Sequence, residues 1–472
     1  MNGRKHISLP LLLLGACLVF LVIAPLATVF VKALIINDHL DFSFAAAALS
    51  EPQNARMIRN SLLLGLAVVI LSSLISIPLA YLFSRTQLGQ HKIFDLLFLI
   101  PFMTPPYIAS MGWILFMQKR GLFSQMVPAF PNGIPLFFTF GGLVLVMSLH
   151  IFPFMMVLMK NAMLHIPSSL EEAAAISGAG YGRRLRKIFF PLLTGNYVIG
   201  ALLVFVKTLS EYGTPYTLGR RIGFDVFTTD IHRYAAVAPI DFGKAAVLAS
   251  VLVTICMVLW LVQNYITVHH SYNLISGKGS RMRIHRLSSP GKVLAILYIG
   301  LILVISIGIP YFSVISTSLI RLRGFGLAAG NFTFHHYVEL FTDSETALPA
   351  IGNSFLLGLL SATICAILGT VIVLSIRAGR SRFGKVLEAM SLLPEMLPGI
   401  VLVIGLMLFW NDIYDILPLY NTMGIMVITY TALFLPYTVQ YVTSASTQLS
   451  ESLLEAGRVF GGSRYYIFRH IT

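Results

Sequence analysis

Charged residues are scarce in this sequence of 472 residues. Only 11% are Asp, Glu, Lys or Arg and 57% are hydrophobic, whereas soluble domains carry about 25% charged residues. This composition excludes an ordinary soluble domain. The apolar residues instead form runs of roughly 20, long enough to cross a hydrocarbon core of about 30 Å as helices.

Cysteine is equally rare. Cys17, Cys256 and Cys365 all lie inside apolar runs at unrelated spacings, which indicates neither a disulfide framework nor a metal cluster. The sequence also lacks a phosphate-binding loop, an H-E-x-x-H motif and a nucleophile elbow. We therefore predict no cofactor, no metal and no catalytic residue. Any ATP hydrolysis linked to this chain would belong to another subunit.

The net charge of +14 reflects membrane topology better than nucleic-acid binding. Its basic residues lie at the ends of apolar runs and form no patch interleaved with aromatic residues, so we predict no nucleic-acid partner. With a cytoplasmic N-terminus, the basic clusters in 183–187, 278–286 and 377–385 all face the cytoplasm, as the positive-inside rule requires.

Ten apolar runs qualify as membrane spans surrounded by lipid. In the resulting map, 162–188 and 267–290 face the cytoplasm, whereas 36–58, 211–243 and 320–350 face outward. The predicted spans cover 9–35, 60–84, 93–117, 134–159, 191–210, 244–266, 291–319, 351–376, 386–410 and 420–443.

The chain repeats itself. Residues 60–65, Asn-Ser-Leu-Leu-Leu-Gly, recur as Asn-Ser-Phe-Leu-Leu-Gly at 353–358, an offset of 293. An even number of spans separates the copies, which predicts a parallel repeat with a pathway between its halves. The predicted domains are a first half (1–266), a polar cytoplasmic linker (267–290) and a second half (291–472). The same offset relates Pro101 to Pro394 and Pro105 to Pro398.

A short motif lies between the fourth and fifth predicted spans. Residues 172–178 read Glu-Ala-Ala-Ala-Ile-Ser-Gly. Alanines favour a helix, an acidic residue favours its N-terminal end, and glycine permits the turn that follows. The segment 161–190 is therefore predicted to form a cytoplasmic helix–turn–helix. An amphipathic interfacial loop is the alternative for one copy alone.

This motif resembles the EAA loop of ABC importer permeases, with the pattern E-A-A, three residues, G, nine residues, I-x-L-P. Phe190 stands where that pattern has Leu, and Gly457 replaces an Ala in a second copy at 446–472. The sequence stops before the second Leu-Pro and before two further spans. We therefore expect an incomplete second half with four spans.

The resemblance implies an all-α, polytopic transmembrane helical bundle built from two parallel repeats of the type I ABC importer permease fold. It also implies a bacterial cytoplasmic (inner) membrane location, a cytoplasmic ABC ATPase dimer and a periplasmic or lipid-anchored solute-binding protein. The residues that it assigns to ATPase coupling are Glu172, Ala173, Ala174, Gly178, Ile188 and Pro191, with Glu455, Ala456, Gly461 and Ile471 in the second copy.

The fused halves, Phe-Phe-Pro-Leu-Leu at 189–193 and Ser-Glu-Tyr-Gly-Thr-Pro at 210–215 look most like iron(III) permeases. Permeases for thiamine, 2-aminoethylphosphonate or polyamines stay open as alternatives. A secondary transporter with repeated halves is an alternative of another class, although it has no reason to carry the two cytoplasmic motifs.

Glu395 is the only acidic residue deep inside a predicted span. Such a carboxylate costs about 2.5–3.5 kcal/mol on insertion scales, so it usually faces a cavity or a partner. It either lines the pathway or lies near an interface and pairs with a basic side chain such as Lys207. The residues predicted to lie along the pathway are Glu395, Pro101, Pro105, Pro394, Pro398 and Glu211.

Overall fold

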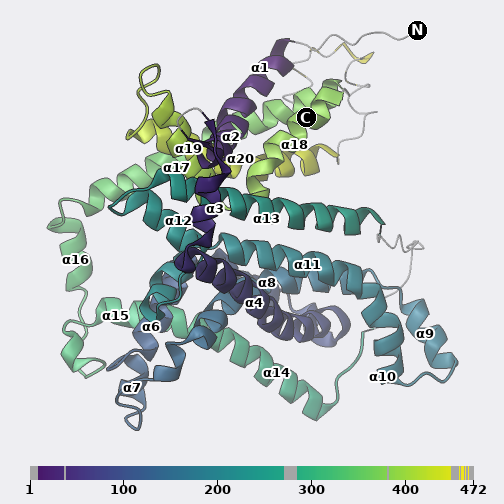
Figure 1. Ribbon diagram of the computed structural model, residues 1–472. Helices are drawn as coiled ribbons and strands as arrows, with labels where there is room; N and C mark the ends of the chain where they lie inside the picture. Colours follow the sequence, from purple (N-terminus) through teal and green to yellow (C-terminus); the bar gives the residue numbers. More distant parts are fainter. Residues whose placement is uncertain are drawn as a thin grey trace. The chain divides into compact units, whose positions relative to one another are not determined.

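The computed structural model describes residues 9–36, 39–269, 284–379 and 382–447, with 457, 459–461, 463 and 466. This part of the chain is helical apart from one short antiparallel hairpin, β1 (Ile35–Ile36) and β2 (His39–Leu40), which the sequence did not predict (Figure 1). Eight described helices can each span a membrane, and two bent helix pairs raise the number of candidate spans to ten. These coincide with the ten predicted runs, so the helical, polytopic character is confirmed.

The chain forms two compact units, each built from separate segments. The α4 unit comprises Ala46–Ile240 and Thr254–Ser344, and the α17 unit comprises Met1–Ala45, Asp241–Val253 and Glu345–Thr472. Each unit therefore contains the first span of the other predicted half. The division of the repeated sequence into two halves, 1–266 and 291–472, remains a prediction. Two of the four unit boundaries fall within helices, in α3 (Phe42–Ser50) and α13 (Phe242–His269), and the other two lie between elements.

In the α4 unit, the long helix α4 (Pro52–Arg85) packs along α8 (Phe140–Leu164) and α11 (Phe190–Ser210) (Figure 1). The Ser76 hydroxyl donates to the Phe152 carbonyl over 2.8 Å, a polar contact typical of membrane helix pairs. The other elements are η2 (Gln87–Gln90), α5 (Lys92–Met103), α6 (Pro106–Met117), α7 (Leu122–Met126), η3 (Pro135–Phe137), α9 (Ser168–Ile176), α10 (Tyr181–Arg184), η4 (Leu185–Phe189), η5 (Pro215–Gly219), η6 (Arg220–Ile222), α12 (Phe227–Ala236), α14 (Ser289–Leu303), η7 (Val304–Gly308), α15 (Ile309–Leu319), η8 (Arg323–Phe325) and α16 (His335–Thr342).

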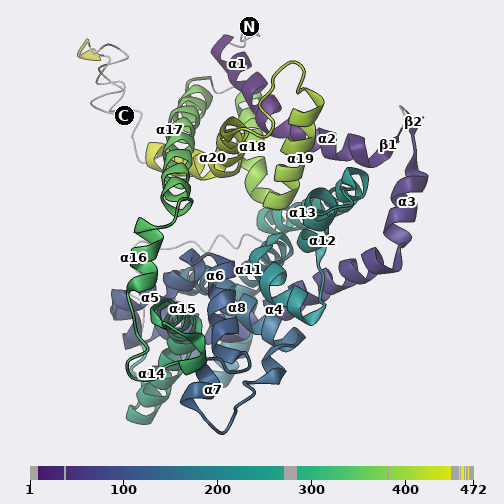
Figure 2. The same ribbon diagram turned by 90° about the vertical axis from the view of Figure 1, so that its left-hand side faces the viewer.

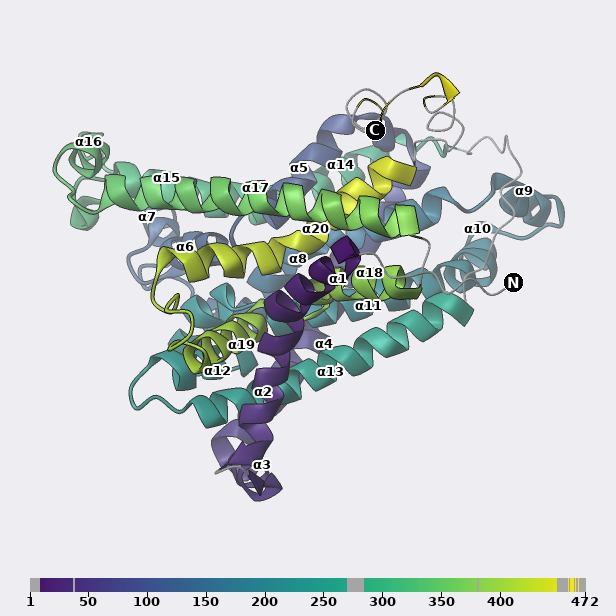
Figure 3. The same cartoon turned by 90° about the horizontal axis from the view of Figure 1, so that it is seen from above.

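In the α17 unit, α17 (Ala347–Gly379) and α20 (Met423–Thr447) lie side by side, as Figures 2 and 3 show from two directions. The N-terminal span packs on the same unit, and Leu18, Ile372, Leu387 and Leu435 form part of one buried apolar cluster. The remaining elements are α1 (Leu9–Leu18), η1 (Val19–Ile23), α2 (Ala24–Leu34), α18 (Arg382–Met396) and α19 (Gly399–Asp412).

Two predicted spans, 93–117 and 386–410, are each broken into two helices. α5 and α6 meet at 90°, and α18 and α19 meet at 110°. Pro105 is the N-cap of α6 and Pro398 is the N-cap of α19, and a proline disfavours helical geometry in the residue before it. The second proline of each matched pair therefore ends a helix, whereas Pro101 and Pro394 lie inside α5 and α18.

The first span of each half crosses the helix that follows the break in the other half. A β-carbon on Gly112 of α6 would lie 2.5 Å from the carbonyl oxygen of Pro310 in α15, and one on Gly405 of α19 would lie 2.6 Å from that of Pro25 in α2. In both spans the proline follows a π-helix, η7 or η1. The two units thus contain the same close crossing, which only glycine permits.

Candidate functional site

The predicted cytoplasmic loop forms two short helices, α9 and α10, joined by a tight turn. Gly178 has a φ of +76°. The N–H of Ala179 donates a hydrogen bond to the carbonyl oxygen of Ala174 over 2.9 Å, and the N–H of Gly178 donates one to the carbonyl oxygen of Ala175 over 3.0 Å. This pair of bonds is the Schellman motif, in which a left-handed glycine ends a helix. The predicted helix–turn–helix is present at this place.

The second copy shares the decisive feature. Gly461 has a φ of +79°, and a β-carbon on either Gly178 or Gly461 would meet nothing within 4 Å. The requirement for glycine is therefore one of backbone conformation rather than of space. Glu455, Ala456 and Ile471 lie outside the described residues.

The loop presents uncovered apolar side chains. Ile176 at the end of α9 is 88% exposed, and Val459 and Phe460 in the second copy are 83% and 89% exposed. Glu172 and Ala173 are exposed and Ala174 is partly buried. Figures 1 and 3 show α9 and α10 extending beyond the end of α11. These apolar side chains, uncovered by the rest of the described chain, are available for contact with a partner.

The loop returns to the membrane through the last part of the motif. Ile188 lies in the π-helix η4 and is partly buried, whereas Pro191 is exposed in the first turn of α11. Proline is tolerated there because the first N–H groups of a helix have no intrahelical partner.

A polar cavity of about 210 Å³ lies beside the break between α5 and α6. It brings together Glu211 and Phe102 with two ionisable residues that the sequence analysis did not single out as pathway residues, His150 and Lys207. His150 Nδ1 lies 2.8 Å from the carbonyl oxygen of Pro101. The cavity is also lined by Met147, Ile151, Thr208 and Ser210.

Glu211 follows the last residue of α11 and has one unused carboxylate oxygen. Its Oε1 accepts a hydrogen bond from the N–H of Thr214 over 2.8 Å, whereas Oε2 is buried and has no hydrogen-bond partner among the described residues. Burial raises the pKa of Glu211 to about 7, against the opposing hydrogen bonds from Thr214 and Gly213. Lys207, one turn earlier, forms no ion pair with any described residue. Glu211 thus holds an acceptor ready for a ligand or a proton.

In the other broken pair, Glu395 accepts a hydrogen bond from the side-chain amide of Gln440. Gln440 lies on α20, 45 residues further along the chain, so sequence reasoning had no signal for this partner. The sequence did offer a reason to single out His150 and Lys207, because both lie within predicted spans, where ionisable residues are rare and usually functional. In the part of the chain that the structure describes, no three His, Cys, Asp or Glu side chains gather as a metal site.

Comparison with known proteins supports a transport role. Residues 74–267 match the family model for "Binding-protein-dependent transport system inner membrane component". The chain is 25% identical to the ferric transport system permease protein FbpB of Actinobacillus pleuropneumoniae, covering 98% of this chain and 67% of that protein. It is 26% identical to the putative ferric transport system permease protein FbpB 1 of Haemophilus influenzae, and the match covers 98% of this chain and 73% of that protein.

One solved structure with partial similarity is a bacterial alginate ABC transporter in complex with an alginate pentasaccharide-bound periplasmic protein. It covers 55% of this chain and 94% of its own, at 17% identity and a TM-score of 0.45. The matched family is one of inner membrane components, and the described part of this chain has eight to ten candidate membrane spans. Residues 74–267 are thus similar to the inner membrane components of binding-protein-dependent transport systems.

Proposed function

We propose that this protein is the permease subunit of an ATP-driven ABC importer for iron(III). The observation that carries the proposal is the repeated cytoplasmic turn, with Gly178 and Gly461 in the same left-handed conformation. A conformation that costs other residues roughly 1–2 kcal/mol occurs at both copies of one motif. A paired docking surface for a symmetric ATPase dimer accounts for both copies.

In this proposal, α9 and its counterpart seat on a separate cytoplasmic ATPase dimer through exposed apolar residues such as Ile176. Closure of the dimer on ATP moves the loops, and the loops move the spans that enter and leave them. A periplasmic or lipid-anchored binding protein delivers the solute. The solute then passes the broken helices, and the carboxylates proposed to attract a cation by charge are Glu211 in the α4 unit and Glu395 in the α17 unit.

Iron(III) is proposed because both of the relatives described above that match almost the whole chain are ferric permeases. Imidazole and charged oxygen donors near the pathway, His150 and Glu211, agree with a metal cation as cargo. Thiamine, 2-aminoethylphosphonate and polyamines are the competing solutes.

Uptake into proteoliposomes tests this assignment. The permease, reconstituted with its ATPase, is offered binding proteins loaded with iron(III), thiamine, 2-aminoethylphosphonate or a polyamine. ATP-dependent accumulation of iron alone is the expected result. Accumulation of another solute would reassign the cargo, and uptake without any ATPase would indicate a secondary transporter.

A further inference from the structure

Arg85, the last residue of α4, is a charged side chain that is fully buried. Burying a guanidinium is costly unless hydrogen bonds satisfy it. Its Nη2 donates to the carbonyl oxygens of Met163 over 2.6 Å and Ile166 over 3.0 Å. Met163 lies in the last turn of α8 and Ile166 two residues beyond its end, where the helix dipole favours a cation.

The same guanidinium also contacts the other arm of the loop. Its central carbon lies 4.9 Å from the ring centre of Phe189, a distance typical of a cation–π contact. Met163 and Ile166 precede α9, whereas Phe189 ends η4 and leads into α11. Arg85 therefore connects the end of α4 to the arm that enters the coupling loop and to the arm that leaves it.

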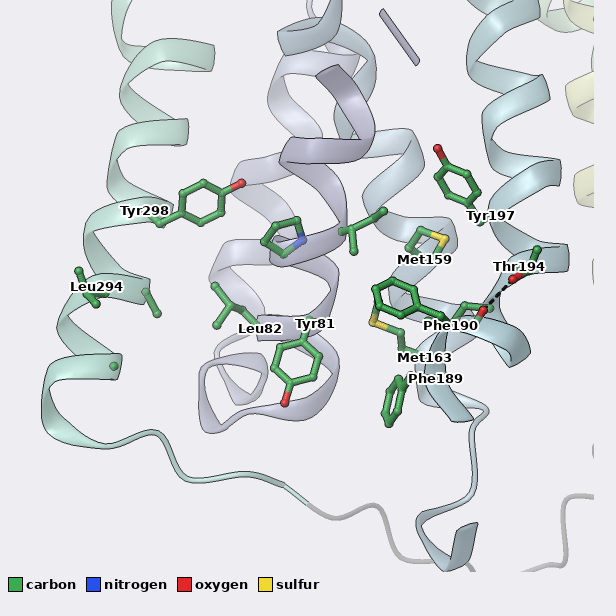
Figure 4. A pocket seen from close by; sticks show the side chains of 15 residues that line it. Tyr81, Leu82, Met159, Met163, Phe189, Phe190, Thr194, Tyr197, Leu294 and Tyr298 are labelled. Atoms are coloured by element: carbon green, nitrogen blue, oxygen red, sulfur yellow. Dashed lines mark hydrogen bonds between the residues drawn. The ribbon is translucent and has the colours of Figure 1, made fainter. Parts of the chain in front are cut away.

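An open apolar cavity of about 640 Å³ adjoins this contact. Figure 4 shows Tyr81 and Leu82 of α4 on one wall, with Phe189, Phe190 and Thr194 of the exit arm on another. A cavity leaves its lining without packing partners on one side. The cavity separates part of the exit arm from α4, and the Arg85–Phe189 contact bridges the two elements next to that space.

The second half contains an equivalent bond. An offset of 283 relates Glu172 to Glu455 and Gly178 to Gly461, and it also places α8 on α20. The same offset places Met163 on Ser446. Arg377, near the end of α17, donates through Nη1 to the carbonyl oxygen of Ser446. An arginine at the end of the long helix thus holds the same loop entry in both units.

We infer that Arg85 and Arg377 are positioning residues that transmit movement of the coupling loops to α4 and α17. The inference rests on the proposed function, because it assumes that the loops receive movement from an ATPase. Arg85 does not touch the ATPase surface, since it is buried behind α8 and η4. Its removal should therefore separate ATP hydrolysis from transport rather than prevent ATPase binding.

The test uses the reconstituted permease–ATPase complex with its solute-loaded binding protein. We expect Arg85→Met to retain bound ATPase and ATP hydrolysis but to raise the ATP consumed per solute transported by about tenfold, the scale of a typical coupling energy. Arg85→Lys should restore part of the coupling, because an ammonium can donate to the carbonyls but lacks the planar face that stacks on Phe189. Arg59→Met, a loss of the same charge from an exposed residue of the same helix α4 that lies outside the coupling loop, is the control and should leave the ratio unchanged.

Phe189→Leu provides a second test that leaves no charge unpaired. It removes the ring but keeps both carbonyl bonds of Arg85, so a smaller rise in the same ratio is expected even if Arg85→Met does not fold. An unchanged ratio in both Phe189→Leu and Arg85→Met would overturn the inference. Failure of the unmodified permease to bind the ATPase would instead refute the proposed function.

Discussion

Gly178 ends α9 in the left-handed region, with open space around the position of a β-carbon. Gly178→Val should cost roughly 1–2 kcal/mol in backbone conformation alone and should weaken ATPase binding and abolish transport. Gly178→Asn should retain more activity, because asparagine tolerates this region. Gly182→Ala is the matched control, since Gly182 also has open space but no positive φ. Equal transport by the Val and Ala variants would show that the turn is not required.

Glu211 gives a pH-dependent test. Its raised pKa of about 7 means that the folded state holds the proton more tightly than the unfolded state. The free energy of unfolding contributed by this group is therefore present below about pH 4.5 and is lost as the pH rises through 7. Relative to the unmodified protein, Glu211→Gln should gain roughly 2–3 kcal/mol between pH 5 and pH 8.

Thermal unfolding of the purified protein in detergent, followed across that pH range, measures this difference. The neutral glutamine keeps an acceptor for the N–H of Thr214, so the comparison isolates the charge. A difference in midpoint temperature that stays constant with pH would mean that Glu211 is ionised throughout, and that the buried oxygen of the carboxylate is solvated.

At the scale of helices, the paired crossings are the most specific feature. Gly112→Ala and Gly405→Ala each place a methyl group within 2.6 Å of a backbone carbonyl, so each should destabilise its own unit by about 1–3 kcal/mol. Gly300→Ala in α14, where nothing lies within 4 Å, should be neutral or slightly stabilising. The measurement is the midpoint temperature of thermal unfolding of each variant. Equal midpoint temperatures for all three variants would contradict the close crossings.

Sequence reasoning located these helices but not their breaks or crossings. Apolar run length identified all ten candidate spans, and an offset of 293 matched the prolines of the two spans that are broken. A proline pattern does not fix an angle, however, so bends of 90° and 110° were not predicted. The crossings escaped detection because the first spans repeat with an offset of 285, relating Pro25 to Pro310, rather than 293.

Within the candidate site, features formed by neighbouring residues were predictable from the sequence, whereas contacts between distant residues were not. The turn at Gly178 was predictable because a helix and the glycine that ends it are adjacent in sequence. The contacts of Glu395 with Gln440 and of Arg85 with Met163 join residues on different helices. Such contacts depend on packing, which a single sequence does not specify.

For the whole molecule, the predicted topology places 180 in the cytoplasm and 330 outside. In a background lacking Cys17, Cys256 and Cys365, an impermeant thiol reagent should label Gly330→Cys in intact cells but label Gly180→Cys only after permeabilisation. The expected orientation follows from the distribution of basic residues. The reverse labelling pattern would invert the map and place the coupling loops on the wrong side for an ATPase.

Co-purification with the ATPase tests the central claim most directly. We predict that the unmodified permease retains the cytoplasmic ATPase in detergent and that a loaded binding protein stimulates its ATP hydrolysis. Ala174→Arg on α9 should lose both effects while the permease stays folded. Retention of the ATPase by the Ala174→Arg and Gly178→Val variants at the unmodified level would contradict the assignment of this loop as the site of coupling.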